Sequence, residues 1–414
     1  MRQADSYATV NPTPPGGVQG AQNPGDTTRP RIVLAHDWLV GLRGGERVLH
    51  HIARVAARLG SVEAILTMFD DGAPLTDELD AIPRQVATLG RLPGALRMRR
   101  WLLPVYPAAV GQLSDRLALM HRMQRIDLVV STSSAAIKGL RTPPGVPHVC
   151  YCHSPARYLW SQADQYGGRF QRLGLRAFGG ALRSWDRATA GHVDAFLANS
   201  THVARLIATA YGREAKVIHP PARTEFFTPG TEPRERHWLA VGAIEPYKRF
   251  DLAIEAARRS GVPLRIVGDG SVRAALERSA PAHVRFLGRV SDEQLRREMR
   301  TAAVLLFPQV EDFGITAVEA QACGLPVAAR AEGGALDIVR DGQTGALCDG
   351  SPEQLAEAAN RAAACDPPRC VANARRFSEA SFEQAIQVEF EHHLKRPAAG
   401  PASQPHERPA EHRP

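Results

Sequence analysis

Residues 303–319 read AVLLFPQVEDFGITAVE and combine an apolar run, a turn and the start of a helix. The run 303–307 is typical of a buried parallel strand. Glu311 and Glu319 bracket the turn, and Gly314 lies between them. Carboxylates bind hydroxyl groups, and N–H groups at a helix start bind phosphate. A sugar joined to a nucleotide through a diphosphate carries both kinds of group, so this stretch predicts such a ligand at a strand end.

The two glutamates differ in whether a purely structural role could account for them. Glu311 directly follows the predicted strand, where open α/β sheets bind their ligands. Glu319 also completes the pattern Thr316-x-x-Glu319, which is typical of a capping box at a helix start. The sequence therefore assigns Glu311 to a ligand and leaves a structural role open for Glu319.

Strands alternate with helices throughout the chain, in two series. This pattern indicates an α/β fold of two doubly wound parallel sheets that face each other across a cleft. Helix starts are expected near Ser200, at Ser291-x-x-Gln294 and at Ser351-Pro352. The expected strands are 31–36, 127–131, 148–152 and 195–198 in the first series, and 238–242, 264–268, 284–287 and 303–307 in the second.

The domain boundaries follow from composition. Pro220-Pro221 interrupts the alternation, which predicts an N-terminal domain at 30–225 and a C-terminal domain at 226–380. A last helix at 381–395 is expected to cross back onto the first domain. Residues 1–29 and 396–414 are polar and rich in Pro, and we expect disordered tails there, with no signal peptide or membrane span in the chain.

Three further segments carry groups that could bind a diphosphate or a sugar. Gly44-Gly45 stands between the first strand and a helix, where glycines let a ligand approach the backbone, although a plain tight turn accounts for them too. Lys248-Arg249 follows a strand and could neutralise a departing diphosphate, or lie in a solvated loop. His153 ends the strand 148–152 and could contact a sugar hydroxyl or serve only in packing.

Other features exclude several classes of site. The six cysteines lack metal-ligand spacing, and no two Asp residues stand at i, i+2, so we expect reduced thiols and chemistry without a metal. Val267-Gly268-Asp269-Gly270 begins like a dinucleotide fingerprint, but Arg273 replaces its third glycine. His50 and His51 have no partner at ligand spacing and are interpreted as surface or packing residues.

The positive charge belongs to the N-terminal half. Residues 30–225 hold 25 basic and 15 acidic residues, whereas the whole chain has a net charge of +8. Residues 91–103 and 169–176 mix arginines with apolar side chains, which favours an anionic membrane surface or an ordinary amphipathic core helix equally. No basic-aromatic motif supports nucleic-acid binding.

Together these segments resemble the retaining, nucleotide-sugar-dependent glycosyltransferases of family 4, which have the GT-B fold. The resemblance covers about residues 30–395. It is most specific at Glu311–Glu319 with the following Ala322-Cys323-Gly324-x-Pro326-Val327, and extends to Gly44–Arg47, His153–Tyr158 and Gly242–Lys248. Ala243-Ile244 departs from relatives that carry Arg near this position, which places more of the phosphate neutralisation on Lys248 and Arg249.

The resemblance implies a role for each of these residues. Glu311 would contact hydroxyls of the donor sugar, Glu319 the ribose, and Lys248 with Arg249 the diphosphate. Gly44 and Gly45 would approach the diphosphate from the other domain, and His153 would lie near the reacting sugar. The main-chain N–H groups that would hold the sugar and the diphosphate belong to Phe313, Gly314 and Ile315.

The implied reaction needs no cofactor, metal or protein nucleophile. Residues 35–39, 185–186 and 220–221 look closest to mannosyl- and rhamnosyltransferases of bacterial surface polysaccharide synthesis, so GDP-mannose is the expected donor. The expected acceptor is a lipid-diphosphate-linked glycan at the cytoplasmic face of the inner membrane. The alternatives are a soluble transferase that uses a UDP- or dTDP-sugar on a small acceptor, an epimerase or phosphorylase, and a nucleic-acid-binding protein.

Overall fold

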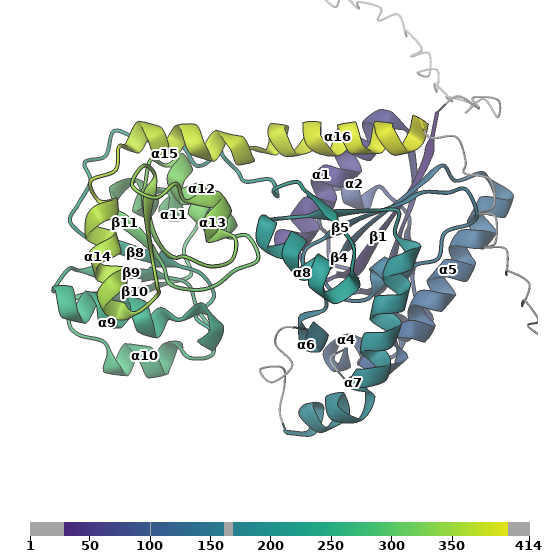
Figure 1. Ribbon diagram of the computed structural model, residues 1–414, viewed down its shortest axis with the longest axis horizontal. Coiled ribbons are helices and arrows are strands. Elements are labelled where there is room, and N and C mark those ends of the chain that lie inside the picture. Colours follow the sequence, from purple (N-terminus) through teal and green to yellow (C-terminus); the bar gives the residue numbers. More distant parts are fainter. Residues whose placement is uncertain (1–28, 100, 161–168, 396–414) are drawn as a thin grey trace, which may run out of the picture.

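The computed structural model describes residues 29–99, 101–160 and 169–395, with side chains omitted for 169–177. Two domains stand side by side along the long axis, each with a parallel sheet between helices (Figure 1). This is the predicted α/β fold of two Rossmann-like domains. The predicted tails lie outside the described residues, except for Arg29. No helix in the described ranges is long and apolar enough to cross a bilayer.

The N-terminal domain has a seven-stranded sheet with the order β3-β2-β1-β4-β5-β6-β7, and every neighbouring pair is parallel. The strands are β1 (Arg31–Leu39), β2 (Ser61–Asp70), β3 (Arg84–Val86), β4 (Leu128–Ser133), β5 (His148–Cys152), β6 (Ala195–Ala198) and β7 (Ala215–Val217). The helices are α1 (Gly44–Leu59), α2 (Asp77–Asp80), α3 (Thr88–Arg91), α4 (Ala95–Met98), η1 (Leu103–Val105), α5 (Tyr106–Met123), η2 (Ile137–Gly139), α6 (Arg157–Trp160), α7 (Arg169–Thr189), η4 (Ala190–His192) and α8 (Thr201–Tyr211).

The C-terminal domain has a six-stranded parallel sheet with the order β10-β9-β8-β11-β12-β13. The strands are β8 (Trp238–Val241), β9 (Leu264–Val267), β10 (Val284–Gly288), β11 (Val304–Phe307), β12 (Val327–Arg330) and β13 (Gly345–Cys348). The helices are η5 (Pro246–Lys248), α9 (Phe250–Ser260), α10 (Arg273–Ser279), α11 (Asp292–Thr301), α12 (Ile315–Ala322), α13 (Ala335–Ile338), α14 (Pro352–Ala362), α15 (Pro367–Ala374), η6 (Arg375–Phe377) and α16 (Glu379–Lys395).

The central strands are buried on both faces, which is why they read as continuous apolar runs. In the C-terminal domain one cluster contains Leu305 and Phe307, and a second contains Val304 and Leu306, so alternate residues of β11 face opposite layers. β8 and β11 are neighbours, and their carboxyl ends lie at the same edge of the sheet. Segments that follow these two strands therefore meet, although they are far apart in the sequence.

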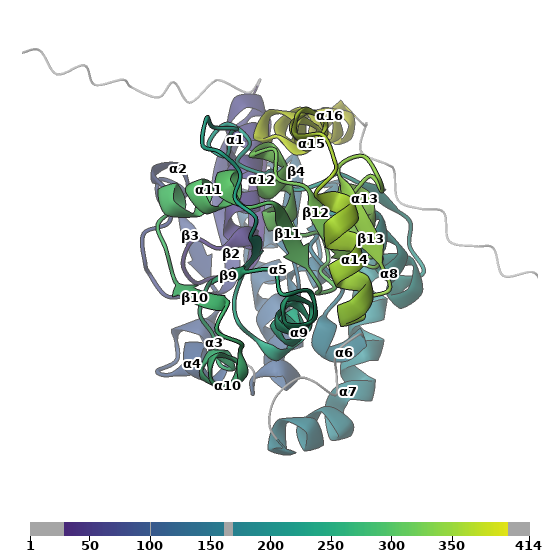
Figure 2. The same cartoon turned by 90° about the vertical axis from the view of Figure 1, so that its left-hand side faces the viewer.

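Helix α16 crosses from the C-terminal domain to the N-terminal domain, along the top of both views (Figures 1 and 2). Its Phe382, Ile386 and Phe390 are buried in the core formed by β1, β4 and α1. On its polar side Glu383 accepts a 2.8 Å hydrogen bond from Nδ1 of His51. The spacing within the sequence shows no carboxylate partner for His51, because its partners Glu379 and Glu383 come from a helix more than 300 residues away.

The predicted helix starts give a mixed result. Ser200, Ser291 and Ser351 each accept a main-chain hydrogen bond from three residues ahead, as expected for N-caps. The proposed capping box at Thr316 is wrong, because α12 begins at Ile315 and its N-cap is Gly314. Glu319 therefore lies inside the helix, where it cannot close the first turn, and its carboxylate must have a different partner.

Candidate active site

A cleft of about 450 Å³ lies between the two domains. Both sheets contribute the segments that follow their central strands, as the fold requires. Eight of the ten predicted site residues line it, from both sides. The lining consists of His36, Trp38, Arg43, Gly44, Gly45, Glu46, Val48, Ser134, His153, Arg157, Asn199, Pro220, Tyr247, Lys248, Val310, Glu311, Asp312, Phe313, Gly314, Ile315 and Thr316.

On the C-terminal side the cleft presents an ion pair between Lys248 and Glu311. Lys248 ends η5, which follows β8, and Glu311 follows β11. Nε2 of Gln309 donates a second hydrogen bond of 3.0 Å to the Glu311 carboxylate. Both charged side chains are mostly buried, at 16% and 23% exposure. A cation and a carboxylate thus lie together at the edge of the sheet. The ammonium could bind a diphosphate, and the carboxylate could accept a hydrogen bond from a sugar hydroxyl.

The start of α12 forms the neighbouring wall. Gly314 has φ of +109°, and a Cβ there would lie 2.8 Å from the ring of Phe307, so only glycine fits without movement. This conformation turns the chain from the Glu311 loop directly into the helix. The first N–H groups of α12 consequently lie beside Glu311 and Lys248, and a helix N-terminus favours a negatively charged ligand.

A second glycine pair, Gly333-Gly334, supports this loop. A Cβ on Gly333 would lie 2.4 Å from the carbonyl oxygen of Glu311, and one on Gly334 would lie 2.2 Å from that of Phe313. The N–H of Gly334 donates a 2.9 Å hydrogen bond to the main-chain carbonyl of Glu311. These glycines therefore allow close backbone packing behind the loop, and they do not line the cleft. The glycines at 268 and 270 similarly allow close approach to the main chain of residues 242 and 244.

Two predicted residues do not line the cleft. Glu319 is 7% exposed, and Nε of Arg223 donates a 3.2 Å hydrogen bond to it. Burial raises the pKa of Glu319, and Arg223 opposes that shift. The guanidinium of Arg249 pairs with Asp251 at 2.9 Å, and its side chain is 42% exposed. The geometry thus favours Lys248 over Arg249 as the phosphate partner and leaves Glu319 beside the cleft.

On the N-terminal side the glycine pair opens helix α1 and does not precede it. Gly44 and Gly45 form the first helical turn, so their N–H groups belong to a helix start. Glu46 accepts a 3.1 Å hydrogen bond from the main-chain N–H of Arg43, which caps this turn. Glu46 therefore has a structural role at this helix start, and it lines the cleft together with Gly44 and Gly45.

His153 directly follows β5. Its N–H donates a 2.8 Å hydrogen bond to the main-chain carbonyl of Ser133, and its carbonyl accepts one of 2.9 Å from the side chain of Asn199. Nε2 is inaccessible to solvent and has no hydrogen-bond partner in the described part of the chain. Burial and the nearby His36 lower the pKa of His153 to about 3, so its ring is neutral at pH 7. A fixed, neutral imidazole with a free nitrogen suits a hydrogen bond to a sugar hydroxyl.

An ion pair between Arg157 and Asp312 joins the two walls of the cleft. Ser200 also donates a hydrogen bond to the main-chain carbonyl of Asp312. Neither charged residue has a role predicted from the sequence, although each lies inside a motif of the resemblance, four residues after His153 and one after Glu311. The sequence does show that Arg157 and Asp312 carry opposite charges and follow strands of different domains. It does not show that they pair, because the pairing depends on how the two domains meet.

Asp37 organises a further loop of this wall from inside the protein. Its carboxylate accepts main-chain hydrogen bonds of 2.6 to 2.9 Å from four consecutive residues, 134–137. This arrangement gathers the N–H groups after β4 around one buried charge. It fixes the loop that contributes Ser134 to the cleft.

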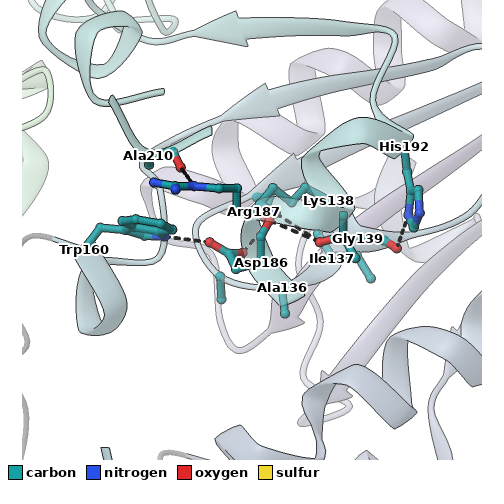
Figure 3. Close-up of polar contacts among 12 residues, drawn as sticks. Ala136, Ile137, Lys138, Gly139, Trp160, Asp186, Arg187, His192 and Ala210 are labelled. Carbon is teal, nitrogen blue, oxygen red and sulfur yellow. Dashed lines mark hydrogen bonds and ion pairs between the residues drawn. The ribbon is translucent and has the colours of Figure 1, made fainter. Parts of the chain in front are cut away.

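A buried polar network holds α6 in place (Figure 3). The ammonium of Lys138 lies 2.9 Å from the carboxylate of Asp186, and both side chains are 1% exposed. The other oxygen of Asp186 accepts a 2.7 Å hydrogen bond from the indole of Trp160, at the end of α6. The ring of Tyr211 lies 4.5 Å from the same ammonium. Because Arg157 begins α6, this network anchors the segment that reaches the other domain.

Two protein families match the two domains. Residues 42–226 match the family described as "Glycosyltransferase Family 4", and residues 222–383 match "Glycosyl transferases group 1". Each domain thus matches a glycosyltransferase family, and together the two matches account for most of the described chain. The matches meet near Pro220-Pro221, and each covers the segments that its side contributes to the cleft.

Curated relatives match over a limited part of their length. A D-inositol 3-phosphate glycosyltransferase of Mycobacterium sp. (strain KMS) is 39% identical over 156 residues, which cover 32% of this chain and 36% of the relative. The protein of that name from Mycobacterium bovis (strain BCG / Pasteur 1173P2) is 35% identical over 182 residues, 38% of each chain. The match thus spans little more than a third of these relatives.

Solved structures share the whole fold. Sucrose-phosphate synthase from Thermosynechococcus elongatus has a TM-score of 0.66 at 17% identity, covering 88% of this chain and 98% of that one. Anabaena Alr3699/HepE in complex with UDP has a TM-score of 0.63 at 18% identity, covering 87% and 100%. At such identities the likeness establishes the GT-B architecture alone and says nothing about the substrates.

Proposed function

We propose that this protein is a glycosyltransferase that transfers a hexose, with retention of configuration, from a nucleoside diphosphate to a hydroxyl of a glycan. The observation that carries this proposal is the composition of the cleft. Lys248, Glu311 and the start of α12 line one side, and Gly44, Gly45 and His153 line the other. The cation and the helix starts suit the diphosphate of a nucleotide sugar, and the carboxylate and the neutral imidazole suit its sugar hydroxyls.

Each wall has a separate task in the proposed reaction. The N–H groups of α12 and the ammonium of Lys248 would hold the diphosphate, whose negative charge grows as the bond to the sugar breaks. Glu311 would accept hydrogen bonds from hydroxyls of the sugar, and His153 would contact it from the opposite side. Such groups are fixed before the reaction, so they stabilise the developing charge without reorganisation.

The chemical step proceeds on one face of the sugar. The bond between the anomeric carbon and the phosphate oxygen breaks, and a bond to the acceptor oxygen forms on the same side. The acceptor hydroxyl gives its proton to the departing phosphate oxygen. The leaving nucleoside diphosphate thus serves as the base, and no protein nucleophile is needed.

GDP-mannose is the donor that we propose, on the basis of the likeness of residues 35–39, 185–186 and 220–221 to mannosyl- and rhamnosyltransferases. A UDP-hexose is the second candidate, because a neighbour of the same fold is a complex with UDP. Thermal shifts with GDP, UDP, ADP and dTDP would rank the bases. Release of the nucleoside diphosphate from each sugar nucleotide, with and without acceptor, then tests the reaction, and no release from any of them would refute the proposal.

We also propose that the acceptor is lipid-linked and that the N-terminal domain docks on an anionic membrane. Residues 91–103 are not one helix, because α3 ends at Arg91, α4 spans Ala95–Met98 and η1 begins at Leu103, so the alternative of one amphipathic core helix is wrong for this segment. They expose Leu92, Met98 and Trp101 at 52–53% of their surface, next to Arg91 and Arg97. Arg100 and the side chains of 169–176 lie outside the described residues. Apolar side chains beside arginines suit an anionic lipid surface.

Flotation with phosphatidylglycerol vesicles at low salt tests this docking. Trp101→Asp should abolish the flotation. Val388→Asp is the matched control, because Val388 is equally exposed, at 56%, but lies on α16. Equal flotation of both variants, or none by the unchanged protein, would favour a soluble enzyme with a small acceptor.

The proposed transfer requires no metal ion or other cofactor. Among the described residues there is no group of three His, Cys, Asp or Glu side chains placed to hold a metal. Lys248 and the helix starts would supply the positive charge at the diphosphate. Full activity after dialysis against EDTA is expected, and activity that returns only with a divalent cation would contradict this part of the proposal.

A further inference from the structure

His36 is a second histidine of the cleft, beside the predicted His153. It lies near the end of β1, and its main chain is paired with Thr132 of β4. Its side chain is 5% exposed and lines the cleft. The proposed glycosyl transfer gives this imidazole no task.

The two imidazoles approach the same point. A Cβ placed on Gly45 would lie 3.4 Å from Cε1 and 3.7 Å from Nε2 of His36, and 3.7 Å from Nε2 of His153. The Nε2 atoms of both rings therefore border the small space that glycine leaves open at the start of α1. A ligand group that enters this space would contact both rings at once.

The opposite edge of the His36 ring is fixed by Thr132. Nδ1 forms a hydrogen bond of 2.5 Å with Oγ1 of Thr132. The hydroxyl of Thr132 can accept this bond, and the neutral tautomer that donates it carries its proton on Nδ1. Nε2 then keeps its lone pair, and it is the edge that borders the cleft.

Charge does not change this assignment. Burial lowers the pKa of His36 to about 4, and that of His153 to about 3. Both rings are uncharged at pH 7, so His36 is a weak base but a good hydrogen-bond acceptor. A lone pair in a buried position is costly if no donor meets it. Hydroxyl groups of sugars are donors of the required kind.

We infer that His36 is a substrate-binding residue whose Nε2 accepts a hydrogen bond from a sugar hydroxyl held between His36 and His153. This inference rests on the proposed function. The hydroxyl belongs either to the transferred hexose or to the acceptor, and the two sources differ in what the loss of His36 changes.

The test uses two amides that each replace one edge of the ring. His36→Asn keeps a polar group near the position of Nδ1 and the contact with Thr132, but leaves the cleft side empty. His36→Gln reaches the position of Nε2 and can still accept from the hydroxyl. We expect His36→Asn to lower kcat/KM of transfer at least tenfold, the scale of one lost buried hydrogen bond, and His36→Gln to keep most of it.

The source of the hydroxyl follows from two further measurements on His36→Asn. If the hydroxyl belongs to the donor hexose, KM for the sugar nucleotide rises, and its slow hydrolysis without acceptor falls as well. If the hydroxyl belongs to the acceptor, that hydrolysis is unchanged and KM for the acceptor rises. Affinity for the free nucleoside diphosphate should stay within twofold, because that ligand carries neither the hexose nor the acceptor hydroxyl.

Two results would overturn the inference. Transfer by His36→Asn within twofold of the unchanged protein, or a greater loss in His36→Gln than in His36→Asn, would assign His36 to the contact with Thr132 alone. Failure of the proposed function is distinct, because the unchanged protein would then release no nucleoside diphosphate from any sugar nucleotide.

Discussion

Lys248 and Glu311 form an ion pair in the cleft although 63 residues separate them in the sequence. Replacing either by Ala leaves the other charge mostly buried and removes one contact to the donor. We expect each variant to lose tenfold to a hundredfold or more in kcat, the scale of a lost charge-assisted hydrogen bond. The double variant should lose less than the product of the two single losses, because the residues are in contact.

Arg249→Ala is the matched control for Lys248→Ala. Arg249 is adjacent in the sequence, but its guanidinium pairs with Asp251 and does not line the cleft. The turnover of the Arg249→Ala variant should stay within about twofold to threefold of that of the unchanged protein. Near-normal transfer by both Lys248→Ala and Glu311→Ala would refute the assignment of this site.

Glu319 permits a test of ribose binding separate from its contact with Arg223. If Glu319 accepts hydrogen bonds from ribose hydroxyls, Glu319→Gln should weaken binding of the nucleoside diphosphate about tenfold. It should also lose the preference for the ribonucleotide over its 2′-deoxy analogue. Titration calorimetry with both nucleotides measures this. A lower melting temperature with unchanged affinities would instead assign Glu319 to packing against Arg223.

Asp37→Asn should destabilise the N-terminal domain without removing any group that lines the cleft. The carboxylate accepts four main-chain hydrogen bonds, and an amide has one oxygen to offer. Buried N–H groups without partners cost about 2 kcal/mol or more in the free energy of unfolding, or roughly 4 °C in melting temperature. Thermal unfolding followed by circular dichroism checks this, and an unchanged midpoint would mean that water replaces the lost acceptor.

Local patterns were sufficient to predict most of the central strands, although the internal strands β2 and β12 were missed. β5 and β6 begin and end at the predicted residues, because buried parallel strands are continuous apolar runs between turn residues. The edge strands β3 and β7 have three residues each and no fully buried side chain, so no such run marks them. The serine N-caps were also predictable from local sequence, because a serine directly before a helical segment is a preferred N-cap.

Contacts between distant segments limited prediction of the site. Lys248, Glu311 and His153 each follow a strand, and that position alone predicted their place in the cleft. The pairing of Arg157 with Asp312, and of His51 with Glu383, depends on how the two domains and α16 meet. Arg249 has the same sequence context as Lys248, but its left-handed main chain, with φ of 53°, directs it elsewhere.

His51 should make the docking of α16 dependent on pH. Burial alone would lower the pKa of this histidine, but hydrogen bonds and charges of Glu379 and Glu383 outweigh it and raise the pKa above 6.5. A raised folded-state pKa stabilises the fold fully below pH 6.5, and this contribution is lost as pH rises through the raised value. The pKa values of both carboxyl groups are lowered in turn, so they remain charged well below neutral pH.

The free energy of unfolding of His51→Gln, compared with that of the unchanged protein, isolates this contribution. The difference should be about 1.5 kcal/mol at pH 6 and should shrink toward pH 9 as His51 loses its proton. His50→Gln is the matched control, because burial lowers the pKa of His50, whose Nδ1 lies 3.1 Å from the hydroxyl of Thr76 and 3.9 Å from the carboxylate of Glu78. In the His50→Gln variant, the free energy of unfolding should still fall between pH 6 and pH 9, as is expected for the unchanged protein. A His51→Gln difference that is constant from pH 6 to 9 would show that the charge of His51 does not contribute to the docking of α16.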